Sequence, residues 1–267
     1  MRKQISSIHN LLIKELFQLK EKSRDRKKTQ TFLIEGLREI SLAIYGGYLI
    51  ESLLVDFSII NEASLNSLLE KNEYNIEVIE ISNEVYKKLA TRDTTEGILA
   101  KAKFKDLSLK NIQFKSNNPL ILVAEAPEKP GNIGALLRTA DASGIDAVFI
   151  ANPITDIYNP NIIRSSVGCL FTTNIAEGTT SEIITFLKEK NINIYGAALN
   201  ASVEYQKIDY KQPSAIIVGT EATGLTDEWL KNTTKNIIIP MRGAIDSMNV
   251  SVSAAIIIFE AVRQRNL

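Results

Sequence analysis

The first part of the chain alternates between helical and strand-like spacing of its apolar residues. Apolar residues three and four positions apart predict a helix near the N-terminus, at Ile8, Leu11, Leu12 and Leu16. Short apolar runs then alternate with further helical stripes. They predict strands at 31–35, 49–55, 76–81 and 97–101 and helices at 37–45, 63–70 and 83–90. This alternation indicates a small α/β domain.

From Leu120 onward the strands are expected to be continuous apolar runs. They lie at 120–123, 147–150, 194–199, 215–218 and 237–239, and helices are predicted at 133–143, 162–168, 182–190, 227–232 and 250–265. Unbroken apolar runs separated by helical patterns are typical of a parallel sheet that is covered on both faces. The predicted fold class is therefore α/β, with a parallel-sheet domain in the second half.

A polar stretch separates the two halves. It is rich in Lys, Ser and Asn and has no strong period. A chain of 267 residues is long enough for two modest domains. We expect a first domain at 1–105, a linker at 106–118 and a second domain at 119–267.

Composition excludes several classes of protein. Hydrophobic residues make up 45% of the chain and charged residues 23%, which is ordinary for a globular protein with a core. Cys169 is the single cysteine, so an internal disulfide and a multi-cysteine metal site are excluded and a reducing cytoplasm is favoured. No apolar run approaches the roughly 20 residues of a membrane span. We therefore expect a cytoplasmic protein without a metal.

The net charge is zero, and the distribution of charge along the chain is more informative about possible partners. Residues 1–28 hold nine Lys and Arg against three Asp and Glu, and the charges are densest at 20–28. Local basic clusters contact phosphates whatever the overall charge is. Such a cluster can equally be a solvated helix face, and both interpretations stay open at this point.

The first candidate site loop runs from Lys129 to Ala140, directly after a predicted strand. Asn132 stands where a helix N-cap is expected, and Gly134 permits close approach of a ligand. Arg138 lies away from the centre of the apolar stripe of this helix. For this loop alone, a capping Asn132, a packed Gly134 and a solvated Arg138 are an equally good account.

Two further loops follow apolar strands. Residues 219–225 contain two glycines and Glu221, and ligands of open α/β sheets sit at such strand ends. In the third loop, at 239–253, Asn249 and Ser247 are candidate helix caps. Ser251 and Ser253 also enter the apolar helix, and buried polar groups need partners. This helix end is therefore expected to face a ligand or a tightly folded loop.

The three segments resemble, in order and spacing, the motifs of the SpoU-type (TrmH-like) RNA ribose 2′-O-methyltransferases of the SPOUT superfamily. The matching motifs are Asn132-x-Gly134-x-x-x-Arg138-Thr139-Ala140, Gly219-x-Glu221-x-x-Gly224-Leu225, Ile239-Pro240-Met241-x-Gly243 and Ser247-x-Asn249-Val250-Ser251. Residues 164–168 are similar to the family's intervening segment, and 32–38 and 97–100 to its substrate-binding domain. The resemblance covers nearly the whole chain.

Three positions depart from the family pattern. Met248 stands where leucine is usual, a swap of similar volume. Val167 replaces a smaller residue, and Glu96 stands where glutamine is common, which affects RNA contacts rather than methyl transfer. None of these changes removes a residue on which the chemistry depends.

The resemblance implies a fold, a cofactor and an assembly. It implies that the second domain is tied as a deep trefoil knot, an exception to the usual absence of knots. S-adenosylmethionine would lie among the three loops, held by residues that supply main-chain contacts and apolar walls: Gly219, Thr220, Ile239, Met241 and Met248. The family is homodimeric, with the final helix at the interface and each active site built from both subunits. No metal is implied.

The resemblance also implies an activity, the transfer of a methyl group to a ribose 2′-hydroxyl of tRNA or rRNA that the first domain binds. Arg138 would act at the 2′-hydroxyl and the adjacent phosphate. Asn132 and Glu221 would position the reacting groups, with Asn249 and Ser247 supporting. A guanidinium normally stays protonated, so stabilisation of the developing alkoxide suits Arg138 better than a base role. Phosphate or water would then accept the proton.

Two other classes of function compete with this one. A catalytically silent RNA-binding or ribosome-assembly protein could keep the fold, and the basic N-terminal region supports it. The intact Asn132, Arg138, Glu221 and Asn249 argue against it. A nicotinamide-dependent enzyme would need the glycine fingerprint G-x-G-x-x-G and an acidic ribose-binding residue, and the sequence lacks both in the expected place.

Overall fold

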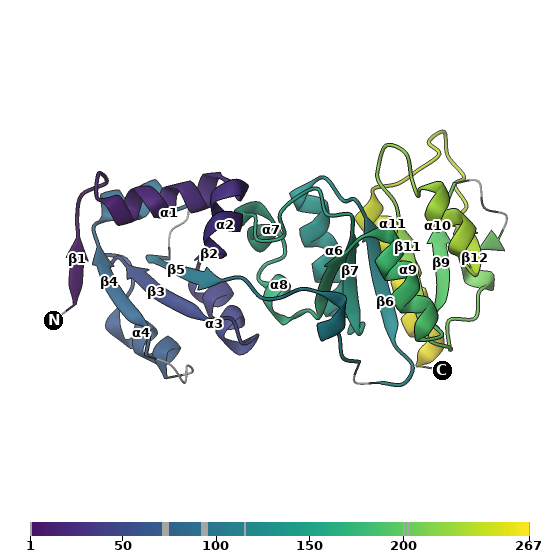
Figure 1. The fold of residues 1–267 in the computed structure, drawn as a ribbon, viewed down its shortest axis with the longest axis horizontal. Coiled ribbons are helices and arrows are strands. Elements are labelled where there is room, and N and C mark those ends of the chain that lie inside the picture. Colours follow the sequence, from purple (N-terminus) through teal and green to yellow (C-terminus); the bar gives the residue numbers. More distant parts are fainter. Residues whose placement is uncertain are drawn as a thin grey trace. The chain divides into compact units, whose positions relative to one another are not determined.

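A computed structural model describes residues 2–70, 75–91, 96–114, 116–199, 201 and 203–266. The chain forms two compact units (Figure 1). The first unit contains residues 1–105 together with 156–172, and the second contains 106–155 and 173–267. Residues 156–172 therefore pack with the N-terminal part of the chain. In the sequence, segments of the second unit lie on both sides of them.

The first unit is built on a mixed five-stranded sheet in the order β1-β4-β3-β5-β2. Its strands are β1 (Lys3–Ile5), β2 (Thr31–Glu35), β3 (Ile50–Val55), β4 (Glu77–Ile81) and β5 (Ile98–Lys103). Its helices are α1 (Leu11–Glu21), α2 (Ser23–Thr29), α3 (Leu37–Tyr45), α4 (Glu62–Leu69), α5 (Asn83–Leu89), α7 (Pro160–Ser165) and α8 (Cys169–Thr172). The α/β pattern predicted for this half is confirmed, and the short edge strand β1 is added to it.

The second unit is built on a seven-stranded, wholly parallel sheet in the order β10-β12-β9-β11-β6-β7-β8. Its strands are β6 (Leu120–Glu125), β7 (Ala147–Ala151), β8 (Ile175–Gly178), β9 (Asn193–Ala197), β10 (Val203–Glu204), β11 (Ser214–Val218) and β12 (Lys235–Ile238). The predicted parallel sheet is confirmed. The edge strands β8 and β10 were not predicted, because neither forms a long apolar run.

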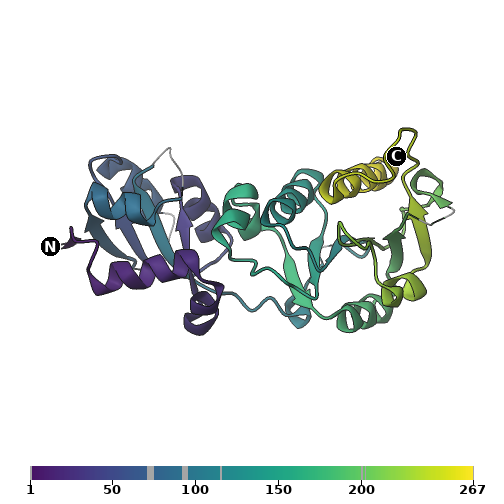
Figure 2. The same ribbon diagram turned by 90° about the horizontal axis from the view of Figure 1, so that it is seen from above.

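Helices cover both faces of this sheet. The helices are α6 (Pro130–Ser143), α9 (Thr180–Glu189), α10 (Asp227–Asn232) and α11 (Val250–Arg265). Figures 1 and 2 show α6 and α11 on one face and α9 and α10 on the other. All residues of β6, β7 and β11 are buried, because each strand contacts helices on both sides. This double burial explains the unbroken apolar runs of the sequence.

Two predicted helices differ in detail from the structure. The helix expected at 162–168 ends at Ser165, and Val167 and Gly168 have φ values of 55° and 85°. Left-handed backbone cannot continue a right-handed helix, so the chain turns there before α8. The helix expected at 133–143 begins earlier, at Pro130, whose ring suits the first helical turn.

The residues from Asp106 to the start of β6 belong to the second unit. They include a short 3₁₀ helix, Leu109–Asn111, and the carbonyl of Leu107 accepts a hydrogen bond from Glu177 N of β8 at 2.8 Å. Lys115, in the stretch expected as a linker, lies outside the described residues. In the part of the chain that the structure covers, no helix is both long and apolar enough to cross a bilayer.

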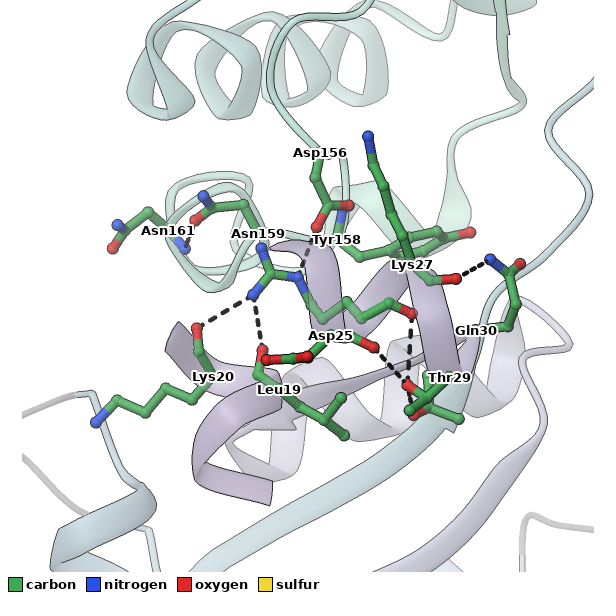
Figure 3. Close-up of polar contacts among 12 residues, drawn as sticks. Leu19, Lys20, Asp25, Lys27, Thr29, Gln30, Asp156, Tyr158, Asn159 and Asn161 are labelled. Atoms are coloured by element: carbon green, nitrogen blue, oxygen red, sulfur yellow. Dashed lines mark hydrogen bonds and ion pairs between the residues drawn. The ribbon is translucent and has the colours of Figure 1, made fainter. Parts of the chain in front are cut away.

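A buried ion pair joins α2 to residues 156–172 within the first unit. Arg26 Nε donates to Asp156 Oδ2 at 2.6 Å, and the two side chains are only 2% and 3% exposed. Arg26 Nη1 also donates to the carbonyls of Leu19 and Lys20, at 2.7 and 3.2 Å, at the end of α1 (Figure 3). One guanidinium therefore fixes α1, α2 and Asp156 to one another.

Aromatic side chains also pack residues 156–172 against the N-terminal part of the first unit. The Tyr158 ring stacks on Phe32 at 4.3 Å between centroids and lies 4.2 Å from Phe104. Its hydroxyl accepts a hydrogen bond from Lys105 N at 3.0 Å. At the other end of the segment, a Cβ on Gly46 would lie 2.0 Å from the Phe171 carbonyl oxygen, so only glycine permits this approach. Residues 156–172 are thus an integral part of the first unit.

We predict that Asp156→Ala lowers the free energy of unfolding by about 3–5 kcal/mol, because it leaves the buried Arg26 charge without its partner. Denaturant unfolding of the full chain measures this. Asp227→Ala, which removes an exposed ion pair with Lys231, is the matched control and should cost below about 1 kcal/mol. Equal losses in the two variants would contradict the assigned role of the buried pair.

Candidate active site

Three loops meet at one edge of the parallel sheet. They follow β6, β11 and β12, and each leads from a strand toward a helix. Because all seven strands run in the same direction, the carboxyl ends of these three strands lie at the same edge. The sheet thereby brings together the three segments that the sequence identified separately.

A line of hydrogen bonds connects the three loops. Asn132 Nδ2 donates to Glu221 Oε1, and Asn132 Oδ1 accepts from Asn249 Nδ2 at 3.1 Å. Lys129 Nζ forms an ion pair with the other carboxylate oxygen of Glu221. The structure therefore brings together three of the residues that the sequence analysis named, because Glu221 and Asn249 each form a hydrogen bond with Asn132.

Asn132 does not cap its helix, so that part of the sequence prediction is wrong. The helix begins at Pro130, and Asn132 lies inside the first turn. Its side chain is consequently free of the helix end and reaches across to Glu221 and Asn249. Asn249, in contrast, is the N-cap of α11, as predicted, and its Oδ1 accepts from Ser251 N at 2.9 Å. Ser247 donates to Asp246 instead of capping.

Beside this line lies a cavity of about 690 Å³. That is a usual size for a cofactor or small-molecule site. Its walls come from β9, β11, β12 and the second and third loops. The five residues that the sequence assigned to cofactor binding all line it: Gly219, Thr220, Ile239, Met241 and Met248. Ser253 also lines the cavity, which accounts for a polar residue in the first turn of an apolar helix.

Gly219 is required by close backbone packing within the second loop. A Cβ at this position would lie 2.2 Å from the Gly224 carbonyl carbon. Thr220 N and Gly224 N each donate to the other residue's carbonyl at 3.1 Å, which closes the loop. Thr220 Oγ1 also accepts from Thr223 N at 3.1 Å. The loop is therefore a tight, preformed wall of the cavity.

Arg138 stands apart from the other three predicted catalytic residues. It is exposed on α6 and lines neither this cavity nor the small pocket between Lys129, Asn132 and Glu221. Within the described chain it forms no ion pair. Among the described residues, no hydrogen bond or ion pair joins Arg138 to the cluster of Asn132, Glu221 and Asn249.

Two charged residues of the site were missed by sequence reasoning. Lys129 gives no signal in the sequence beyond its place before Pro130, and only the fold brings it to Glu221. Glu125, at the end of β6, is 2% exposed and accepts from Thr226 N and Thr226 Oγ1 at 2.9 and 2.7 Å. Because Thr226 directly follows the second loop, Glu125 fixes the far end of that loop to β6.

The described residues contain no group of three or more His, Cys, Asp or Glu side chains placed to hold a metal ion. The charged groups of the hydrogen-bonded line are the Lys129 ammonium and the Glu221 carboxylate, whose side chains are 68% and 33% exposed. A positive ligand group would be attracted to Glu221 and a phosphate to Lys129. The site can therefore bind a positively charged ligand group at Glu221 and a phosphate at Lys129.

Family models match both units. The SpoU rRNA Methylase family model matches residues 119–259, and the MRM3-like substrate binding domain model matches residues 10–100. The first match covers more than half of the chain and contains all three loops.

Similar proteins extend over the full chain. The 23S rRNA (guanosine(2553)-2'-O)-methyltransferase RlmP of Bacillus subtilis is 30% identical over 96% of this chain and 98% of its own length. A crystal structure of an RNA 2'-O ribose methyltransferase is 38% identical, with a TM-score of 0.84 and coverage of 99% of this chain and 100% of the other. The SpoU methyltransferase AviRb from Streptomyces viridochromogenes, in complex with AdoMet, is 26% identical, with a TM-score of 0.88 and coverage of 97% and 99%.

We predict that Gly219→Ala opens the second loop, because the added methyl group overlaps Gly224. The expected loss in the free energy of unfolding is about 1–3 kcal/mol, with faster hydrogen exchange at the amides of Thr220 and Gly224. Gly131→Ala is the matched control, since a Cβ there meets no atom within 4 Å. Unchanged exchange in Gly219→Ala would show that the loop is not held by this close packing.

Proposed function

The chain belongs to the SpoU rRNA methylase family, and we propose that its three loops carry out that family's reaction on ribosomal RNA. The protein is an S-adenosylmethionine-dependent RNA ribose 2′-O-methyltransferase. The observation that carries the site assignment is the contact of Asn132, Glu221 and Asn249 beside the cavity. Retention of this cluster disfavours a catalytically silent assembly protein.

The cavity fits S-adenosylmethionine in size and chemistry. Gly219 and Thr220 offer a tight backbone turn, and the apolar side chains of Ile239, Met241 and Met248 line the space for the adenine. Glu221 supplies a negative charge that attracts a sulfonium. When bound, the cofactor supplies the activated methyl group.

The catalytic roles are those that the resemblance to the family implies. Arg138 stabilises the alkoxide that develops on the ribose 2′-oxygen, because its guanidinium is always positive and cannot act as a base. Asn132 and Glu221 orient the reacting groups, and Asn249 holds the Asn132 amide in place through their hydrogen bond. No metal takes part in this assignment.

The position of Arg138 supports a homodimer in which each site uses both subunits. Arg138 faces solvent in one copy of the chain. On α11, which packs on α6, Val252 and Phe259 are 47% and 48% exposed and lie seven residues apart, on one face of the helix. A second copy covering this face would bring its own Arg138 to the Asn132 and Glu221 of the first.

The proposal also includes a knot, a role for each part of the chain and a cellular location. We assign a deep trefoil knot to the end of the second unit, supported by the family and by residues 239–249, which join β12 to α11 across the site. We assign RNA binding to residues 1–105, a linker to 106–118 and methyl transfer to 119–267. The single cysteine supports a cytoplasmic location.

Ribosomal RNA of the large subunit is the proposed substrate. Two relatives named as 23S rRNA enzymes match 96% and 90% of this chain, including its first unit, and a third matches 72% of it. The relatives named as tRNA (guanosine(18)-2'-O)-methyltransferases match 55% of it. Since a dedicated RNA-binding domain selects the RNA, similarity through that domain favours rRNA.

We predict that the purified protein with S-adenosylmethionine restores one ribose methylation in large-subunit rRNA from cells that lack the gene. Mapping of 2′-O-methylation across total RNA measures this. Arg138→Ala should lose methyl transfer by about 10²-fold or more while calorimetry shows nearly unchanged cofactor affinity. Methylation of tRNA alone would overturn the rRNA assignment, and full activity of Arg138→Ala would remove this residue from the mechanism.

We predict that two inactive variants complement each other. Arg138→Ala and Glu221→Ala chains, co-expressed with different tags, form heterodimers in which one site has both substitutions and the other has none. Equal mixing should restore about one quarter of wild-type activity. If Arg138 served its own subunit, every heterodimer site would carry a substitution and no activity would return. The separate homodimers are the controls.

A further inference from the structure

The exposed charges of α2 are nearly all positive. Arg24 has 85% of its side chain exposed, and Lys22, Lys27 and Lys28 are exposed as well. Asp25 is the only acid within the helix, and its nearest oxygen lies 4.0 Å from Arg24 Nε. The sequence left open whether this run contacts phosphates or is a solvated helix face, and the fold of the first unit bears on that choice.

The buried cation of this helix gives it a fixed place. Seven residues are too few for a helix to be stable alone in water. Arg26 holds α2 by its bonds to the carbonyls of Leu19 and Lys20 and to Asp156 (Figure 3). The pair also removes the Asp156 carboxylate from the surface, because that side chain is 3% exposed. Arg24, Lys27 and Lys28 therefore remain exposed on a helix whose backbone is held in place.

The segment that begins at Asp156 adds a further cation from a different part of the chain. In α7, Asn161 and Arg164 are exposed and three residues apart, so they lie on one helix face. Arg164 and Pro160 line a shallow pocket together with Lys20, at the end of α1, where α2 begins. Because α7 begins four residues after Asp156, the partner of Arg26, α2 and α7 are neighbours within the first unit.

We propose that α2 and α7 form one composite surface that binds the phosphodiester backbone of the RNA substrate. The cations are Arg24, Lys27 and Lys28 from α2 and Arg164 from α7, and Asn161 offers an amide to phosphate or ribose oxygens. The proposal rests on the proposed function and deepens it, because it places RNA contact partly on residues within the 119–267 range assigned to methyl transfer.

The chemistry of the surface favours RNA over a membrane. A membrane-binding helix needs large apolar side chains beside its cations. Among the described residues, none of the exposed large apolar side chains belongs to α2 or α7. Cations on helices without exposed large apolar side chains suit a regularly charged polymer such as RNA, which they bind with release of condensed counterions.

The first test is the double variant Lys27→Gln/Lys28→Gln. It should raise the KM for RNA roughly tenfold at physiological salt, and two lost phosphate contacts should make the log–log salt dependence of RNA affinity less steep by about 1.4–1.8. Lys211→Gln, an exposed lysine of the second unit, is the matched control. Calorimetric binding of S-adenosylmethionine and thermal unfolding report whether the variant chain remains folded.

The second test is Arg164→Gln, which samples the other segment. It should flatten the salt dependence by a further 0.7–0.9, roughly one contact, and add to the double variant. Unchanged salt dependence in both variants, with methylation retained, would overturn the composite surface and leave the proposed function intact. Binding of the wild type to anionic vesicles with the same affinity as to RNA would also overturn it. Absence of RNA methylation by the wild type would instead overturn the proposed function.

Discussion

The amide of Asn132 is the contact on which the active site depends. It joins Glu221, 89 residues away in the sequence, to Asn249, 117 residues away. Such distant residues could not be held together by loops alone, because closing long loops costs conformational entropy. Formation of the parallel sheet already closes these loops, because β6 and β11 are paired and β12 lies in the same sheet. A few hydrogen bonds then suffice to order the loops.

The second loop shows how the site is made rigid before any ligand arrives. At one end, Gly219 packs directly against Gly224. At the other end, the buried Glu125 binds both donors of Thr226. Glu221 lies between these two fixed points and is oriented by Lys129 and Asn132. A preorganised wall of this kind loses little entropy when a cofactor binds.

In the first unit, the buried ion pair between Arg26 and Asp156 joins distant segments in a comparable way. Arg26 and Asp156 come from distant parts of the chain, yet each is nearly inaccessible to water. Because of this pair, one cation of the short helix α2 is buried and the others are exposed. Arg26 is buried and structural, while Arg24, Lys27 and Lys28 remain at the surface. Because the burial depends on residues 156–172, the basic helix and the segment that follows β7 form one surface.

Much of the architecture could be predicted from local patterns. A parallel strand buried on both faces needs an unbroken apolar run, so β6, β7 and β11 were identified from their residues alone. The edge strands β1, β8 and β10 were missed, because strands of two to four residues show no period. The turn at Val167 was also missed, since a β-branched residue rarely adopts a left-handed backbone.

The sequence by itself determined the family, the order of the loops and the residue types that could do the chemistry. Glycines, caps and apolar runs act through local backbone geometry, which depends on residues that are close together in the sequence. Tertiary structure alone decided that Arg26 is buried, that Lys129 meets Glu221 and that Arg138 is left exposed. The role of a charged group depends on its desolvation and its partners, and both are set by segments far away in the chain.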